Sequence, residues 1–168
     1  MKISMYQASV PAFIRALNNL AAILEKGAVH AAAKKFDPAV LVNSRLYPDM
    51  LPLARQVQIA CDTAKNGTAR LAGTDAPKYE DNEATFPELN ARIRKTIAYL
   101  ESLKPEQLDG REDQTVSWQT PSSTKSMLGL PYLLSHTLPN VHFHVTTAYN
   151  ILRHCGVELG KRDFLGPF

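Results

Sequence analysis

The sequence has few cysteines, no long apolar run and hardly any excess of charge. Its 168 residues include two cysteines, Cys61 and Cys155, which are too few for a disulfide scaffold and lack the CxxC spacing of redox or zinc motifs. No stretch of about 18 apolar residues occurs, so we expect no membrane-spanning helix and no membrane partner. Lysine and arginine number 19 against 16 acidic residues, and a charge of +3 without a recognition motif argues against nucleic acid as a partner.

Targeting and catalytic signatures are absent as well. The first residues, Met1-Lys2-Ile3-Ser4, precede no apolar core or cleavage site of a secretory signal, which favours a cytoplasmic location. Two reduced thiols are then the simplest interpretation of the cysteines, with a disulfide or a catalytic pair as the alternative. Glycine-rich phosphate-binding motifs, the GxSxG motif of hydrolases and the HExxH motif of zinc proteases are missing. Composition therefore excludes several classes of protein but identifies no activity.

What is present is enough apolar side chain for a core, arranged with helical spacing. Hydrophobic residues make up 45% of the chain, and its length corresponds to a single domain spanning residues 1–168. Apolar residues recur every three or four positions in four segments, residues 9–26, 52–72, 86–104 and 139–154. Four such helices pack most economically as an all-α four-helix bundle.

Glycine, proline and capping residues divide these segments. We expect the first helix to end at Gly27, a short helix over residues 29–35, a restart at Asp37-Pro38 and an end of the second long helix at Gly73. Thr85 and Glu88 form a capping box at the start of the third helix. Pro139 is expected to break the chain between a helical segment at residues 130–138 and the last helix.

The connection between the third and fourth long helices has a different composition. Residues 115–120 are rich in β-branched and aromatic side chains and are followed by Pro121-Ser122-Ser123, a turn sequence. This pattern predicts a small hairpin or an extended excursion. The tail, residues 158–168, contains two glycines and a proline and is expected to be irregular.

Four of the five histidines fall within nineteen residues, from His136 to His154. At about 100° per residue, His142 and His144 point roughly 160° apart on a helix, so they cannot bind one metal ion together. His144 shares the edge of the inner helix face with Asn140 and Thr147, whereas His142 is expected nearer to solvent. A hydrogen-bonded boundary histidine is the simpler interpretation of His144, and a ligand is the alternative.

Polar side chains also follow one stripe of the second long helix. Arg55, Gln58 and Asp62 lie at positions i, i+3 and i+7, beside a face of small apolar residues. They form either a solvated helix face or a polar wall of a pocket between helices. The basic clusters Arg92-Arg94-Lys95 and Lys161-Arg162 are interpreted as solvated surface.

Several segments resemble a bacterial family known as domain of unknown function 1993, which is similar to the DinB/YfiT-like superfamily. The resemblance extends over essentially the whole chain and is carried by residues 138–154, 156–166, 49–62, 70–73 and 86–100. It implies an up-down-down-up four-helix bundle that is often a homodimer. Better-known superfamily members hold a divalent metal with three histidines, one from the second helix and two from an HxxxH motif on the last. Several of these proteins are thiol-dependent transferases, in which the metal activates the thiol.

The resemblance transfers only part of that metal site. His144 corresponds to the second histidine of HxxxH, Asn140 stands at the first, and the second helix offers Gln58 or Asp62 in place of a histidine. His144 is therefore the single candidate ligand for zinc or nickel, and the three-histidine set is incomplete. We expect a pocket lined by Gln58, Asp62, Asn140, His144 and Thr147. The expected function is binding of a small molecule by a member with a depleted metal site, and the alternative is a metal- and thiol-dependent transferase.

Overall fold

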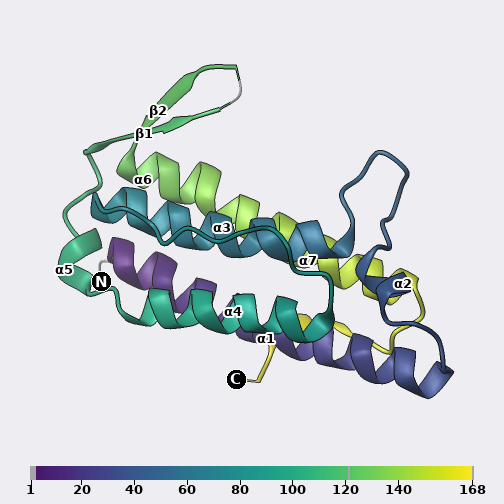
Figure 1. The fold of residues 1–168 in the computed structure, drawn as a ribbon. Coiled ribbons are helices and arrows are strands. Elements are labelled where there is room, and N and C mark those ends of the chain that lie inside the picture. Colours follow the sequence, from purple (N-terminus) through teal and green to yellow (C-terminus); the bar gives the residue numbers. More distant parts are fainter. Residues whose placement is uncertain (1–2, 121, 168) are drawn as a thin grey trace.

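The computed structural model of the chain describes residues 3–120 and 122–167. Four long helices, α1 (Met5–Lys34), α3 (Leu53–Ala72), α4 (Phe86–Glu101) and α7 (Leu138–His154), form a bundle (Figure 1). Helices α1 and α7 run in one direction and α3 and α4 in the other, which confirms the up-down-down-up, all-α arrangement (Figure 1). Of the helices in the described residues, none combines the length and the apolar character needed to cross a bilayer.

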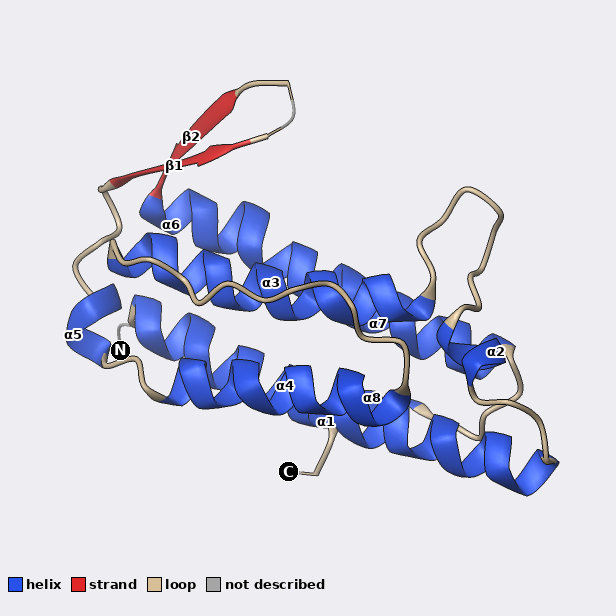
Figure 2. Cartoon of the chain, in the orientation of Figure 1, coloured by secondary structure: helices blue, strands red, loops and turns tan. Residues whose placement is uncertain are grey.

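Because α3 and α4 are consecutive and parallel, the chain must travel the length of the bundle between them. Residues 73–84, which we call the crossing segment, make this passage along α3 and α4 without regular structure (Figure 2). Gly73 ends α3 in the left-handed region at φ 67°, a conformation that suits glycine. At the other end, Thr85 and Glu88 form the predicted capping box of α4.

Helix α1 is longer than the sequence indicated. It begins with a capping box between Ser4 and Gln7 and continues through Pro11 and Gly27 to Lys34, so the prediction of an end at Gly27 was wrong. Gly27 is buried, and a Cβ atom there would lie 3.1 Å from the ring of Phe86 and 3.2 Å from Leu152. The glycine therefore allows close helix packing, and residues 29–34 are the last turns of α1. The chain restarts as expected, with Asp37 accepting from the Ala39 N–H at the start of α2 (Ala39–Val42).

The connection between α4 and α7 contains the predicted hairpin. A short helix, α5 (Pro105–Leu108), precedes strand β1 (Thr115–Gln119), which pairs antiparallel with β2 (Thr124–Leu128). The two strands project from the end of the bundle (Figure 2). Pro121, part of the predicted turn, lies outside the described residues.

The start of α7 differs from the prediction. A short helix, α6 (Gly129–Pro131), continues through a π-helical segment, η1 (Tyr132–Thr137), directly into α7, so Pro139 does not break the chain. The wider winding of a π turn accommodates a residue that has no N–H and whose ring crowds the preceding turn. Gly67 of α3 is buried against Thr137, and a Cβ atom at Gly67 would overlap that side chain. The close contact brings η1 against α3, where the candidate site lies.

The tail is more ordered than predicted. It forms a short helix, α8 (Lys161–Leu165), which is held on α1. Asn19 donates to the Phe164 carbonyl, and Lys26 forms a 2.6 Å ion pair with Asp163. The expectation of an irregular tail was therefore wrong for residues 161–165, because contacts with α1 fix this segment, and Phe168 lies outside the described residues.

Candidate functional site

The polar face of α3 borders two adjoining cavities. One, of about 490 Å³, lies between α3 and the crossing segment, and the other, of about 140 Å³, lies between α3 and the start of the last helix. Both are lined by Asp62, Asn66 and Arg70, so we treat them together as the polar cleft. The smaller cavity is completed by Thr63, Tyr132, His136 and Asn140.

Arg70 is the cation of the smaller cavity. Its guanidinium donates a 3.0 Å hydrogen bond to the hydroxyl of Tyr132, a side chain that is fully buried in η1. Across the described residues, no carboxylate lies within ion-pair distance of Arg70. A half-buried guanidinium without a carboxylate partner has free N–H donors in a cavity, which is the usual arrangement for binding an anion.

His136 lies in the same cavity within a cluster of three rings. Its ring stacks on Trp118 of β1 with 4.8 Å between centroids, and Tyr132 lies 5.2 Å away. Burial lowers the pKa of His136, and the charges of Arg70 and Lys125 lower it further, so the imidazole is neutral at pH 7. The Asn140 amide nitrogen donates to the His136 carbonyl and lies 3.4 Å from Nδ1. A donor at Nδ1 places the ring proton on Nε2, which leaves Nε2–H as a hydrogen-bond donor.

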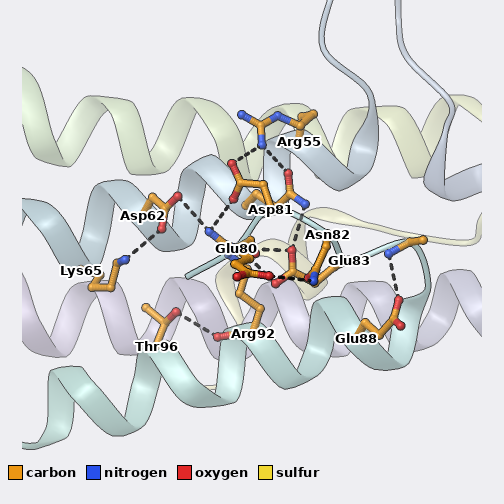
Figure 3. A network of polar contacts seen from close by, with 12 residues as sticks. Arg55, Asp62, Lys65, Glu80, Asp81, Asn82, Glu83, Glu88, Arg92 and Thr96 are labelled. Carbon is orange, nitrogen blue, oxygen red and sulfur yellow. Dashed lines mark hydrogen bonds and ion pairs between the residues drawn. The ribbon is translucent and has the colours of Figure 1, made fainter. Parts of the chain in front are cut away.

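Arg92 occupies the centre of an ion network on the other side of Asp62 (Figure 3). Its Nη2 lies 2.8 Å from Asp62 and 3.0 Å from Asp81, and its Nη1 lies 3.0 Å from Glu83. Arg92 is only 3% exposed, so the interpretation of this residue as solvated surface was wrong. A buried guanidinium is stable only with such partners, and here two of the three come from the crossing segment.

Other side chains of α3 extend this network. Arg55 pairs with Asp81 at 2.5 Å and donates to Gln58, which in turn donates to Glu83 (Figure 3). Burial opposes ionisation of Asp81, but the hydrogen bonds and charges of Arg55 and Arg92 outweigh it and lower the pKa of this carboxyl. The network therefore fastens the crossing segment to both α3 and α4.

Lys65 anchors the wall of the larger cavity. Its ammonium donates to the Pro77 carbonyl at 2.5 Å, lies 3.2 Å from Asp62 and sits 4.0 Å from the centre of the Tyr79 ring. These contacts join α3 to the crossing segment at a second point. The carboxylate of Asp62 is shared between Lys65 and Arg92, so its charge is already neutralised within the protein.

The cysteines are both free. Cys61 is completely buried, and burial raises the pKa of its thiol to about 12. The thiol is therefore protonated at neutral pH and is not a nucleophile or a thiolate ligand.

The five residues expected to share a pocket are distributed over different surroundings. Asp62 and Asn140 line the smaller cavity together. Gln58 is buried in the ion network, and His144 is half-buried with its Nδ1 2.7 Å from the side-chain oxygen of Gln56. Thr147 is buried and donates to the Phe143 carbonyl of its own helix.

The donors do not fit zinc or nickel. In the parts of the chain that the structure describes, no three histidine, cysteine or acidic side chains are grouped so that they could hold a metal ion. The residue four positions before His144 is an asparagine, and the carboxylate of Asp62 is already paired with two cations. Both metals prefer imidazole and thiolate donors, so we assign no role to a metal at this site.

Sequence reasoning missed Arg70, Tyr132 and His136 as site residues. One signal was available for His136, because it precedes Asn140 by four residues and so extends the row of Asn140 and His144 along one helix face. Helical periodicity places Arg92, three residues after Leu89, at the edge of the buried face of α4, but its ion partners Asp81 and Glu83 come from another segment.

Comparisons with known proteins agree with the architecture. The family described as domain of unknown function (DUF1993) matches residues 5–165. The crystal structure of a DinB family member protein from Shewanella denitrificans is similar to this chain with a TM-score of 0.89 and 45% sequence identity, and the match covers 97% of this chain and 92% of that one. No curated protein sequence matches the chain. With its family matched over nearly its whole length, the chain belongs to the DUF1993 family and has the fold of a DinB family member.

Proposed function

We propose that this protein binds a small anionic molecule in the polar cleft, with Arg70 as the principal anchor. The observation that carries the proposal is the guanidinium of Arg70, which shares a cavity with Tyr132, His136 and Asn140 and has no carboxylate partner among the described residues. A planar guanidinium with neighbouring neutral donors matches the geometry of a carboxylate or a phosphate group.

The sizes of the two cavities support a ligand with a charged head and a larger body. A volume of about 140 Å³ suits an anionic group with a few atoms around it, since a water molecule takes about 30 Å³ of liquid volume. The adjoining cavity of about 490 Å³ is within the usual range for small-molecule sites. Its mixed lining of polar and apolar groups, including Tyr79 and Ala69, is suited to the ligand body.

The alternative, a metal- and thiol-dependent transferase, has less support. Such an enzyme needs at least three good donors for its metal, whereas α3 contains no histidine and Asn140 stands four residues before His144. The residues on the polar face of α3 are suited to a charged organic ligand without a metal.

A binding assay with matched arginine variants tests the proposal. Wild-type protein is titrated with inorganic phosphate, succinate and acetate by calorimetry, beside Arg70→Gln and Arg94→Gln, an exposed arginine of α4. We expect at least one anion to bind, Arg94→Gln to match wild type, and Arg70→Gln to bind about tenfold more weakly or worse, as expected for a charged hydrogen bond. Equal affinity of the two variants overturns the proposal.

The metal content of the purified protein distinguishes anion binding from the metal-dependent transferase. Elemental mass spectrometry of untagged protein and of His144→Ala should find no stoichiometric zinc or nickel. Near-stoichiometric metal that is lost in His144→Ala would favour the transferase and contradict our proposal.

The homodimer and the cytoplasmic location stay predictions of the resemblance and of the sequence. Light scattering coupled to size-exclusion chromatography tests the dimer, for which a mass near 37 kDa is twice the 18.6 kDa of one chain.

A further inference from the structure

The β-hairpin meets the bundle beside the smaller cavity of the polar cleft. It projects from the end of the bundle where β2 leads into α6 (Figure 1). Its inward side chains are Val116, which is buried, and Trp118 and Met127, which are partly buried against the core. Outward positions of β1 are exposed, as the alternation of a strand requires.

Trp118 contacts two residues that line the cavity. Its ring is stacked on His136 at an interplanar angle of 30° and lies 5.0 Å from the ring of Tyr132. Each of the three rings contacts the other two, because Tyr132 and His136 are also in contact. Stacking on an indole restricts rotation of the imidazole, so the hairpin fixes the direction of the Nε2–H donor of His136.

Lys125 lies directly opposite Trp118 in the hairpin register. Side chains that face each other in an antiparallel pair emerge on the same side of the ladder, so Lys125 is on the side that faces η1. Within the described residues, neither Lys125 nor Arg70 has a carboxylate within ion-pair distance. Arg70 therefore lines the smaller cavity without an acidic partner, and Lys125, also without one, lies on the hairpin face that carries Trp118 against His136.

We infer that the hairpin supports the anion site from outside its lining, with Trp118 as the residue that positions His136 and Lys125 as a nearby second cation that selects doubly charged ligands. This inference rests on the proposed function. A phosphate monoester and a dicarboxylate share the required chemistry, since both carry two negative charges. A singly charged carboxylate is satisfied by Arg70 alone and gains little from Lys125.

The positioning role is tested without any ligand. Nuclear magnetic resonance of the histidine ring nitrogens is recorded for wild type, Trp118→Phe and Trp118→Ala, with exposed His142 as the internal reference. The nitrogen chemical shifts of Nδ1 and Nε2 report the tautomer, and they differ between tautomers far more than loss of the indole ring current changes them. We expect His136 to keep the Nε2–H pattern in wild type and Trp118→Phe and to average between tautomers in Trp118→Ala. An unchanged Nε2–H pattern of His136 in Trp118→Ala, in a protein that remains folded, overturns the positioning role.

The charge preference is tested by titrating phosphate, succinate and acetate at about pH 8, where phosphate is doubly charged. Lys125→Gln should weaken phosphate and succinate binding about two- to fivefold and leave acetate nearly unchanged. Lys161→Gln, an exposed lysine of α8, is the matched control and should bind like wild type.

Equal binding of phosphate by Lys125→Gln and Lys161→Gln overturns the charge preference. Failure of all three anions to bind the wild type contradicts the proposed function and this preference together. The His136 signals in Trp118→Ala still decide the positioning role in that case, so failure of the function and failure of the positioning are distinguished.

Discussion

At the scale of single residues, two arginines near Asp62 show opposite ways of satisfying a charge. Arg92 is buried among three carboxylates, whereas Arg70 has a tyrosine hydroxyl and open cavity. Burying a charge is costly unless partners replace water, so the partners of Arg92 fix its structural role. In the proposed function, a ligand anion would complete the same kind of pair at Arg70.

Replacing Arg92 should therefore cost stability. Arg92→Met leaves Asp62, Asp81 and Glu83 without their shared cation, and we expect unfolding free energy to fall by about 3–5 kcal/mol. Urea denaturation measures the change. Arg94→Met, at an exposed position of the same helix, should stay within about 0.5 kcal/mol of wild type. Similar losses in the two variants would refute the structural role of Arg92.

The lowered pKa of Asp81 predicts how this network responds to acid. A carboxyl whose folded pKa is depressed stabilises the fold above its unfolded pKa of about 3.9, and this contribution is lost as pH falls through the folded pKa. Asp81→Asn lacks the contribution at every pH. The stability difference between wild type and Asp81→Asn should thus be largest near neutrality and shrink below about pH 4. Urea denaturation across this range would refute the prediction if the difference stayed constant.

At the scale of elements, local signals predicted helices better than they predicted where helices end. The capping box at Thr85 and the left-handed Gly73 depend on neighbours in sequence, and both are found as predicted. Gly27 was misread because its small size serves contacts with Phe86 and Leu152, which are distant in sequence. The passage through Pro139 depends in the same way on the π winding of η1, for which the sequence has no clear signal.

Replacing Gly27 tests whether local helix propensity or packing against distant residues determines which residue is preferred at this position. Alanine has the higher helix propensity by about 1 kcal/mol, so Gly27→Ala would stabilise a helix without close neighbours. Because the new Cβ would meet Phe86 and Leu152, we expect instead a net loss of about 1–3 kcal/mol. Thermal and urea unfolding should show the loss, while Gly160→Ala, where nothing lies within 4 Å, should be nearly neutral. A Gly27→Ala variant that is more stable than wild type would show that helix propensity, and not close packing, dominates at this position.

At the scale of the whole molecule, helical periodicity was sufficient to predict the bundle, and the resemblance supplied its topology. The site was less predictable, because its residues come from segments that only the topology brings together. Parallel α3 and α4 require the crossing segment, which then provides Asp81 and Glu83 to Arg92 and one wall of the polar cleft. Asp62 and Asn140 were found by their helix positions, whereas Trp118 and Arg92 needed contacts that no local pattern records.

This dependence on topology predicts that the crossing segment can open while the helices stay packed. Cys61 reports such opening, since its side chain is completely buried and it directly precedes Asp62 of the ion network on α3. In a Cys155→Ser background, Arg92→Met should increase the labelling rate of Cys61 by at least about tenfold, because local opening needs less free energy once the central cation is gone. Arg94→Met should label at the rate of the background protein. Helical circular dichroism unchanged under the same conditions would distinguish local opening from unfolding. Labelling of Arg92→Met at the background rate would mean that the helices themselves, and not the ion network, protect Cys61.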